Sequence, residues 1–160
     1  MDVAASLRAH WRQAPGLRLA PGLAPADLDA FERRSGLTLP ADLRAALQLA
    51  NGFIDDPLHG WDDVDAEGFQ FLPLESARLS AGRYFTFCRW CLGFNDYAVD
   101  LGAERNGEVL EVYEDVRGGI SGRVLAPSFA AFIALYVADS TLLYGDRQGL
   151  VRRISIERAS

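Results

Sequence analysis

A cluster of acidic residues between positions 55 and 67 contains the side chains of this sequence that are best suited to chemistry. This acidic segment (residues 55–67) has six acids and no arginine, while the other 16 acids of the chain are balanced by its 16 basic residues. The segment therefore carries the whole net charge of −6, on Asp55, Asp56, Asp62, Asp63, Asp65 and Glu67. Such a group of carboxylates is typical of a cation site, of catalytic acids or of a surface for a cationic partner.

A calcium site is the first of these possibilities. The stretch DVDAEG at 63–68 resembles the start of a D-x-D-x-[DN]-G calcium loop, whose twelfth position is a bidentate acid. Here that position is Leu74, and Pro73 removes the helix that should follow. His59 adds one ligand to the segment, whereas a transition-metal site needs at least two converging strong ligands. We therefore expect no metal and no cofactor.

Catalysis by these acids is not expected either. Glycosidase chemistry needs one carboxyl of raised pKa and one of ordinary pKa at a fixed separation, which acids crowded in a loop do not provide. The two histidines, His10 and His59, stand in no context resembling a catalytic triad. The glycines at 118–122 lack the spacing of a nucleophile elbow and the lysine of a phosphate-binding loop. We predict no catalytic residues and no enzyme, with a metal-dependent hydrolase using the aspartates as the enzymatic alternative.

Cys88 and Cys91 form a C-x-x-C pattern, which occurs in redox and zinc sites. A second pair that would complete four zinc ligands is missing from the sequence. The aromatic surroundings predict a strand, in which residues three apart point to opposite faces. Both cysteines are therefore predicted to serve in packing, and their small number fits a reducing compartment.

Length and charge limit the remaining functions. The 160 residues are 49% hydrophobic and 24% charged, as expected of one globular domain spanning 1–160. A sequence pI near 4.9 argues against sequence-independent nucleic-acid binding and favours a basic protein as partner. The first 16 residues do not resemble a secretory signal, and the sequence has no apolar run of 18 residues. We therefore expect a cytoplasmic protein that binds neither nucleic acid nor membrane.

The acidic segment itself is predicted to be an exposed loop, because proline and glycine interrupt it. It also contains Trp61, an aromatic residue of the kind that anchors protein interfaces. A solvated loop that only keeps the protein soluble is the alternative that charge alone allows.

Apolar spacing and helix breakers predict three short helices before this loop and one after the strands. The first contains Leu7 and Trp11 and precedes a linker over 17–24. The others run from Pro25 to a closing Gly36, from Pro40 to a closing Asn51-Gly52, and from a capping Ser128 along the stripe Phe129, Phe132, Ile133, Tyr136 and Val137.

Between these helices the hydrophobic period changes to two, which predicts strands at 69–74, 84–90, 96–101 and 108–113. The last two are expected to pair across the turn Asn106-Gly107. A glycine-rich loop over 116–122, a short strand at 123–125 and a final hairpin within 142–156 complete the prediction. This order, with helices first, then strands and then a helix, indicates an α+β fold without βαβ alternation.

One stretch is more specific than any catalytic motif, namely LDAFERRSGLTLPADLRAALQLANGF at 28–53. It resembles the opening of the SUKH superfamily, which includes Smi/Knr-type regulators of cell-wall synthesis and bacterial toxin-immunity proteins. The stretches FLPLESA (71–77), GFNDYAVDL (93–101), GEVLEVY (107–113) and SFAAFIALY (128–136) follow in the order of that family. The resemblance covers residues 25–138.

The resemblance implies a mostly antiparallel or mixed sheet flanked by helices, no catalytic residues and a protein-binding role. Asn95-Asp96 stands where such proteins often have Gly-Asp, so Asp96 is either a partner-binding residue or a turn cap. The combined hypothesis is an immunity protein that binds a cognate toxin, such as a nuclease or deaminase, through Asp96, Trp61 and the acids of the acidic segment. A Smi/Knr-type regulatory module without a toxin is the alternative.

Overall fold

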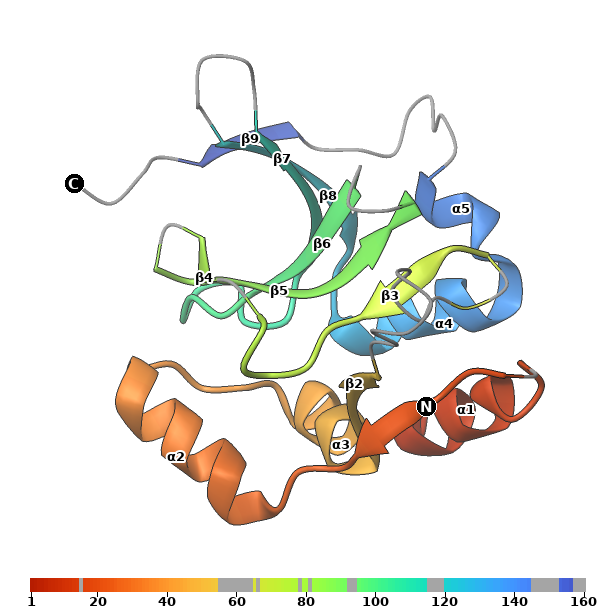
Figure 1. The fold of residues 1–160 in the computed structure, drawn as a ribbon. Helices are drawn as coiled ribbons and strands as arrows, with labels where there is room; N and C mark the ends of the chain where they lie inside the picture. The colour runs from red at the N-terminus through yellow and green to blue at the C-terminus, as the bar shows by residue number, and fades with distance from the viewer. Residues whose placement is uncertain are drawn as a thin grey trace.

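The computed structural model describes residues 1–14, 16–54, 65, 67–77, 79–80, 82–91, 95–114, 120–144 and 153–156, with only the backbone for 113, 114, 120 and 153–156. Three helices and a small sheet form one layer, and a curved sheet with two further helices lies against it (Figure 1). The α+β fold is confirmed. None of the helices in the described residues is long and apolar enough to span a membrane.

The three N-terminal helices follow the predicted pattern. Helix α1 (Val3–Trp11) begins at Asp2, whose side chain accepts a hydrogen bond from the backbone of Ala5 at 3.0 Å. Helix α2 (Pro25–Ser35) begins with proline and ends at Gly36, which has the left-handed φ of 70° typical of a helix end. Helix α3 (Ala41–Leu49) buries Leu43, Ala46 and Leu47.

Two short strands were not predicted in this layer. Strand β1 (Leu19–Pro21) lies in the expected linker and pairs antiparallel with β2 (Ala50–Phe53). The chain therefore passes directly from α3 into a strand, and Gly52 lies within that strand instead of closing the helix. The prediction was wrong because strand pairing between residues far apart in the sequence leaves no local signal in three or four residues.

The large sheet contains seven described strands, all paired antiparallel. In sheet order β3 (Phe69–Phe71), β5 (Tyr84–Trp90), β6 (Asn95–Asp100), β7 (Val109–Glu114), β8 (Ile120–Ala126) and β9 (Arg153–Ile156) are neighbours, and β4 (Leu79–Ser80) also pairs with β5. The predicted pairing of β6 with β7 is confirmed, whereas β8 already begins in the predicted glycine-rich loop.

The C-terminal part contains one confirmed prediction and one error. Helix α4 (Phe129–Asp139) begins at Ser128, whose hydroxyl accepts a hydrogen bond from the backbone of Ala131 at 3.1 Å. A short helix, α5 (Thr141–Tyr144), then takes the place of the first strand of the expected hairpin. Strand β9 pairs with β8, so the C-terminal strand extends the main sheet.

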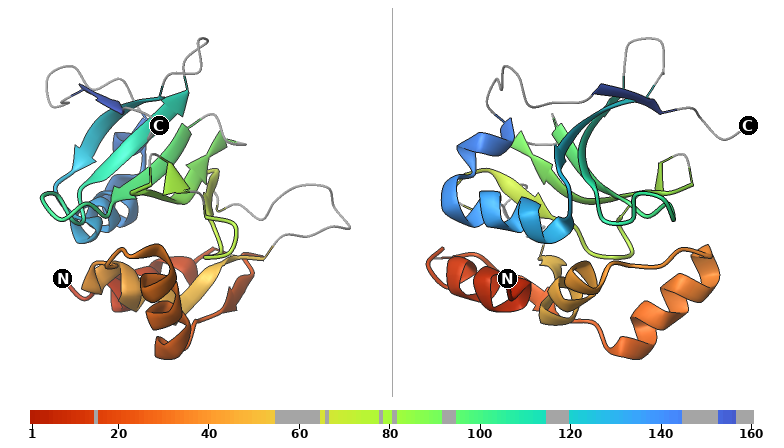
Figure 2. Two further views of the ribbon diagram at one scale, coloured as in Figure 1. Left: turned by 90° about the vertical axis from the view of Figure 1, so that its left-hand side faces the viewer. Right: turned by 180° about the vertical axis from the view of Figure 1, so that it is seen from behind.

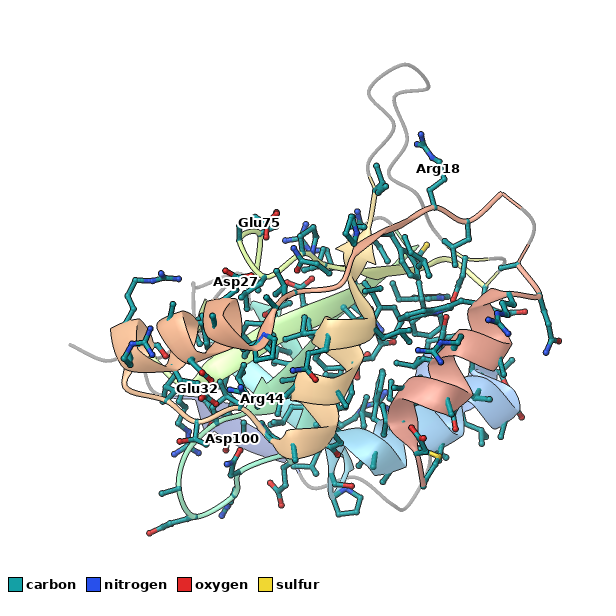
Figure 3. All side chains as sticks on the ribbon, turned by 90° about the horizontal axis from the view of Figure 1, so that it is seen from below. Arg18, Asp27, Glu32, Arg44, Glu75 and Asp100 are labelled. Carbon is teal, nitrogen blue, oxygen red and sulfur yellow. The ribbon has the colours of Figure 1, made fainter. Side chains whose placement is uncertain are left out.

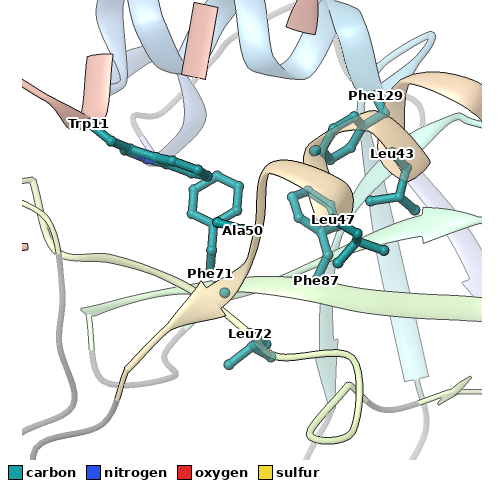
Figure 4. A pocket seen from close by; sticks show the side chains of 10 residues that line it. Trp11, Leu43, Leu47, Ala50, Phe71, Leu72, Phe87 and Phe129 are labelled. Carbon is teal, nitrogen blue, oxygen red and sulfur yellow. The ribbon is translucent and has the colours of Figure 1, made fainter. Parts of the chain in front are cut away.

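The core lies between the curved sheet and the helices, and α4 packs against both α1 and α3 (Figure 2). Trp11, Phe71, Phe87 and Phe129 meet here in edge and tilted ring contacts. Among them is an apolar cavity of about 20 Å³, shown in Figure 4. That volume holds about one water and the walls are mainly apolar, so the cavity is a packing void without room for a ligand.

An ion-pair network joins α2 to α3. Arg44 contacts Asp29 at 2.7 Å and Glu32 at 2.8 Å, and the second oxygen of Glu32 accepts a hydrogen bond from the backbone of Leu39. Glu32 and Arg44 lie side by side when the molecule is seen from the helix layer (Figure 3). The network links the two helices at their surface.

Candidate functional site

The predicted site residues fall into two groups. Asp55, Asp56, Trp61, Asp62 and Asp63 lie outside the described residues, and so does His59. The structure describes Asp65, Glu67 and Asp96, together with the residues that enter and leave the acidic segment.

Asp65 is buried, with 7% of its surface exposed, which contradicts the expectation that every acid of the segment is exposed. Its oxygen Oδ1 accepts hydrogen bonds from the backbone N–H of Glu67 at 3.0 Å and of Phe69 at 2.9 Å. Its oxygen Oδ2 accepts a hydrogen bond from the hydroxyl of Tyr136. These three donors offset the cost of burying a carboxylate. Asp65 therefore has a structural role, as the anchor of the segment's C-terminal end.

Tyr136 extends this anchor to the N-terminal helix. Its hydroxyl oxygen accepts a hydrogen bond from Nε1 of Trp11 at 3.2 Å while the proton points to Asp65. Burial, and then the negative charge of Asp65, raise the pKa of Tyr136 well above its ordinary value. The hydroxyl therefore keeps its proton and acts as the donor to Asp65.

Trp11 also holds the other end of the acidic segment. Its ring meets that of Phe53 edge to face, with centroids 5.5 Å apart, and Phe53 is the last residue of β2. The next residue, Ile54, donates its backbone N–H to the carbonyl of Arg18 at 3.0 Å. Both ends of the acidic segment are thus fixed to the core around one tryptophan.

Asn51 and Gly52 attach this entry strand to the chain after β3, a role that sequence reasoning missed. The side chain of Asn51 accepts a hydrogen bond from the backbone of Leu74 at 2.8 Å and donates one to Glu75 at 3.1 Å. Gly52 has a φ of 79°, and an added Cβ would lie 2.5 Å from the nitrogen of Pro73. The Asn-Gly pair was the only sequence signal at this position. Because this pair commonly ends helices, it was interpreted as a helix end, and the contact with the chain after β3 was missed.

Glu67 differs from Asp65 because its side chain is exposed. Its backbone is nevertheless fixed, since its carbonyl accepts a hydrogen bond from Nε1 of Trp90 at 2.8 Å and its N–H bonds to Asp65. The ring of Trp90 stacks on that of Tyr144, with centroids 4.2 Å apart and planes 10° from parallel. Glu67 is thus a charged side chain on a rigid backbone beside an aromatic pair.

Asp96 lies in β6 and does not cap a turn. It forms an ion pair with Arg89 at 3.2 Å, and about a quarter of its side chain is exposed (26%). The register aligns Gln70, Arg89 and Asp96 across β3, β5 and β6, on the face opposite to the main core. Asp96 and Glu67 therefore lie toward the same end of the sheet, while Asp65 points to the core.

The structure confirms the predicted packing role of Cys88 but contradicts that of Cys91, which lies beyond the last residue of β5. Cys88 is buried in the core and Cys91 is exposed. Burial raises the pKa of the Cys88 thiol well above its ordinary value, so this thiol stays protonated and unreactive. Within the residues that the structure describes, no three histidine, cysteine or acidic side chains are grouped to hold a metal ion.

Two further buried carboxylates, those of Asp100 and Glu111, were not predicted from the sequence. Glu111 on β7 contacts Nε of Arg123 at 2.6 Å and accepts a hydrogen bond from the amide of Asn95. Burial raises the pKa of Glu111. The positive charge of Arg123 lowers it, but the effect of burial is the larger of the two. The alternation of apolar and polar residues predicted a strand here. It did not show that Glu111 faces the side of the sheet that the helices cover.

The amino-acid sequence of the chain matches a known family model. No curated protein sequence matches the chain. The model of the SMI1/KNR4 family (SUKH-1) matches residues 22–135, from the turn before α2 to the middle of α4. The match includes Asn51-Gly52, the entire acidic segment and the first six strands of the large sheet. By the extent of this match, the chain belongs to the SMI1/KNR4 family (SUKH-1).

Proposed function

We propose that this chain is a non-enzymatic immunity protein that binds and blocks a cognate toxin with a basic surface. Family membership supports a protein-binding module of immunity or regulatory type. The observation that carries the proposal is the double anchoring of the acidic segment through Trp11, by Phe53 at one end and by Tyr136 and Asp65 at the other. A segment that holds the net charge of −6 therefore leaves the core at two fixed points.

Fixed ends favour binding for a physical reason. A loop with anchored ends has fewer conformations to lose on association, which lowers the entropic cost of binding. Its concentrated charge attracts a basic groove, such as the one a nuclease or deaminase uses for phosphates, and raises the association rate. Trp61 would supply the apolar anchor that slows dissociation. The toxin is blocked when this segment occupies the site of its nucleic-acid substrate.

Several features support a role without catalysis. Asp65 is engaged by the backbone and Tyr136, Asp96 by Arg89, and Cys88 is a buried thiol of raised pKa. Each of these candidate groups serves packing or pairing in the part of the chain that is described. We also propose a cytoplasmic location, which the free thiols of Cys88 and Cys91 support.

The first experiment is a pull-down of the purified protein against the products of neighbouring genes. Association with the partner is then measured at two ionic strengths for the wild type and for Asp62→Asn/Asp63→Asn. We expect a lower association rate and a flatter salt dependence, because steering is screened over about 8–10 Å at physiological salt. Trp61→Ala is expected to raise the dissociation rate and to cost about 2 kcal/mol or more in binding.

Glu104→Gln is the matched control, because it removes an exposed acid from the turn between β6 and β7. We expect this variant to associate at the wild-type rate. An unchanged rate and salt slope for Asp62→Asn/Asp63→Asn would show that the segment only solubilises the protein and would overturn the proposed interface.

The alternative is a regulatory module of the Smi/Knr type, which the same family match supports. It predicts a host protein as partner in place of a toxin. An adjacent gene for a large toxin that this chain neutralises in a co-expression growth assay favours immunity. Capture of a host regulator together with a failure to protect against neighbouring toxins favours regulation.

A further inference from the structure

A polar pocket of about 280 Å³ lies beside Glu67, between α1 and the C-terminal end of α4. Tyr136 and Ser140 are buried in its wall, whereas Glu67, Asp139 and Thr141 are exposed around it. The pocket is thus open at charged residues and closed at its base. It is more than ten times larger than the apolar void in the core.

The charges around this pocket favour a cation. Glu67 and Asp139 supply two carboxylates, and the C-terminal end of a helix carries the negative end of its dipole. The last turn of α4 contains no basic residue that would neutralise this end. His10 contributes an aromatic wall, with its ring meeting that of Tyr136 at a centroid distance of 4.7 Å.

Glu67 is free to pair with such a cation. Its backbone is held by Asp65 and Trp90, but no described residue hydrogen-bonds to or pairs with its carboxylate. Asp139 is partly engaged, because its side chain accepts a hydrogen bond from the backbone of Thr141 at 3.1 Å. Among the described residues that line the pocket, the main unpaired charge is therefore that of Glu67.

An aromatic surface continues from the pocket. Helix α5 begins at Thr141 in the pocket wall and ends at Tyr144, which stacks on Trp90. Both rings are half-buried, so each leaves part of its surface to solvent. Tryptophan, tyrosine and a neighbouring pocket are the features that concentrate binding energy in protein interfaces.

We propose that this pocket receives an arginine side chain of the protein partner. The planar guanidinium donates several hydrogen bonds in one plane, which suits the carboxylates of Glu67 and Asp139, and it packs well on aromatic rings. The proposal rests on the proposed function, because it names the partner's chemistry at a pocket beside the acidic segment. It makes Glu67 a specificity-determining residue of that interface.

The test uses N-acetyl-arginine amide as probe and its neutral isostere N-acetyl-citrulline amide as control ligand. Each is titrated into the full-length protein while backbone amide NMR shifts are recorded. We expect saturable shifts at His10, Glu67 and residues 137–141 with the arginine probe, and no saturation with citrulline. Glu67→Gln should weaken the probe about two- to fivefold, as for an exposed ion pair, while Glu104→Gln should leave it unchanged.

Three results would overturn the proposal that the pocket binds arginine. These are no saturable shifts with the arginine probe, equal shifts with the citrulline probe, or equal affinity of the probe for wild type and Glu67→Gln. These outcomes do not depend on the identity of the partner, so they are separate from a failure of the proposed function. A toxin that binds through Asp62 and Asp63 but is unaffected by Glu67→Gln would keep the immunity role and reject the arginine pocket.

Discussion

The hydroxyl of Tyr136 donates a hydrogen bond to the buried carboxylate of Asp65, although the two residues are 71 positions apart in the sequence. Through Trp11 the same hydroxyl also contacts the N-terminal helix. One phenol therefore joins α1, α4 and the end of the acidic segment. This joint holds the C-terminal end of the charged segment at a fixed place.

Removing that hydroxyl should destabilise the protein. Tyr136→Phe leaves Asp65 Oδ2 without its donor and Trp11 Nε1 without its acceptor, so we expect the free energy of unfolding to fall by about 1–3 kcal/mol. Urea unfolding measures the change. Tyr144→Phe is the control, because no described residue bonds to its hydroxyl, and it should change stability by less than about 0.5 kcal/mol. Equal effects of the two substitutions would contradict the structural role of the Tyr136 hydroxyl.

The two cysteines should behave differently toward alkylation. Iodoacetamide is expected to modify Cys91 in the native protein and to leave Cys88 unmodified, since burial keeps the Cys88 thiol protonated and out of reach. Mass spectrometry of the digested protein reads out both sites, and denatured protein is the control for reactivity. Cys88→Ser should cost about 1–3 kcal/mol and Cys91→Ser about 0.5 kcal/mol or less. Rapid native alkylation of Cys88 would contradict its place in the core.

Gly52 and Gly36 provide a matched pair of alanine substitutions, because both have positive φ angles, 79° and 70°. A Cβ at Gly36 meets nothing within 4 Å, so Gly36→Ala should cost about 1 kcal/mol from backbone strain alone. A Cβ at Gly52 would clash with the backbone at Pro73, so Gly52→Ala should cost about 3 kcal/mol or more. Denaturant unfolding compares the two variants. Equal losses would mean that the contact between β2 and Pro73 is not tight.

Glu111 should give the unfolding free energy a definite pH dependence. Burial raises its folded-state pKa above the ordinary value of 4.5, so the folded protein binds more protons than the unfolded chain in that range. The stability that Glu111 contributes therefore falls as pH rises from about 4.5 through its higher folded pKa.

The measurement is urea unfolding of the wild type and of Glu111→Gln across this pH range. The wild-type free energy of unfolding minus that of the variant should decrease as pH rises, because glutamine does not titrate. Glu104→Gln, at an exposed position, is the control variant. A Glu111 difference that grows with pH would mean that pairing with Arg123 outweighs burial and lowers the pKa.

Elements whose signals are local were predictable from the amino-acid sequence. The apolar stripe from Phe129 to Tyr136 predicted α4, alternation predicted β5 and β7, and the turn Asn106-Gly107 predicted the pairing of β6 with β7. Such patterns come from residues within a few positions of one another, which interact in any context. The ordered motifs also identified the family, because their spacing follows the order of these elements.

Which acids are structural and which are exposed depends on contacts between residues far apart in the sequence. Asp65 and Glu67 are two positions apart in the same acidic stretch, yet Asp65 is buried against Tyr136 while Glu67 is exposed beside a pocket. The pairing of β1 with β2 and of β9 with β8 was equally hidden. In each case the deciding partner lies far away in the sequence, and a carboxylate becomes an anchor only where folding brings donors to it and removes water.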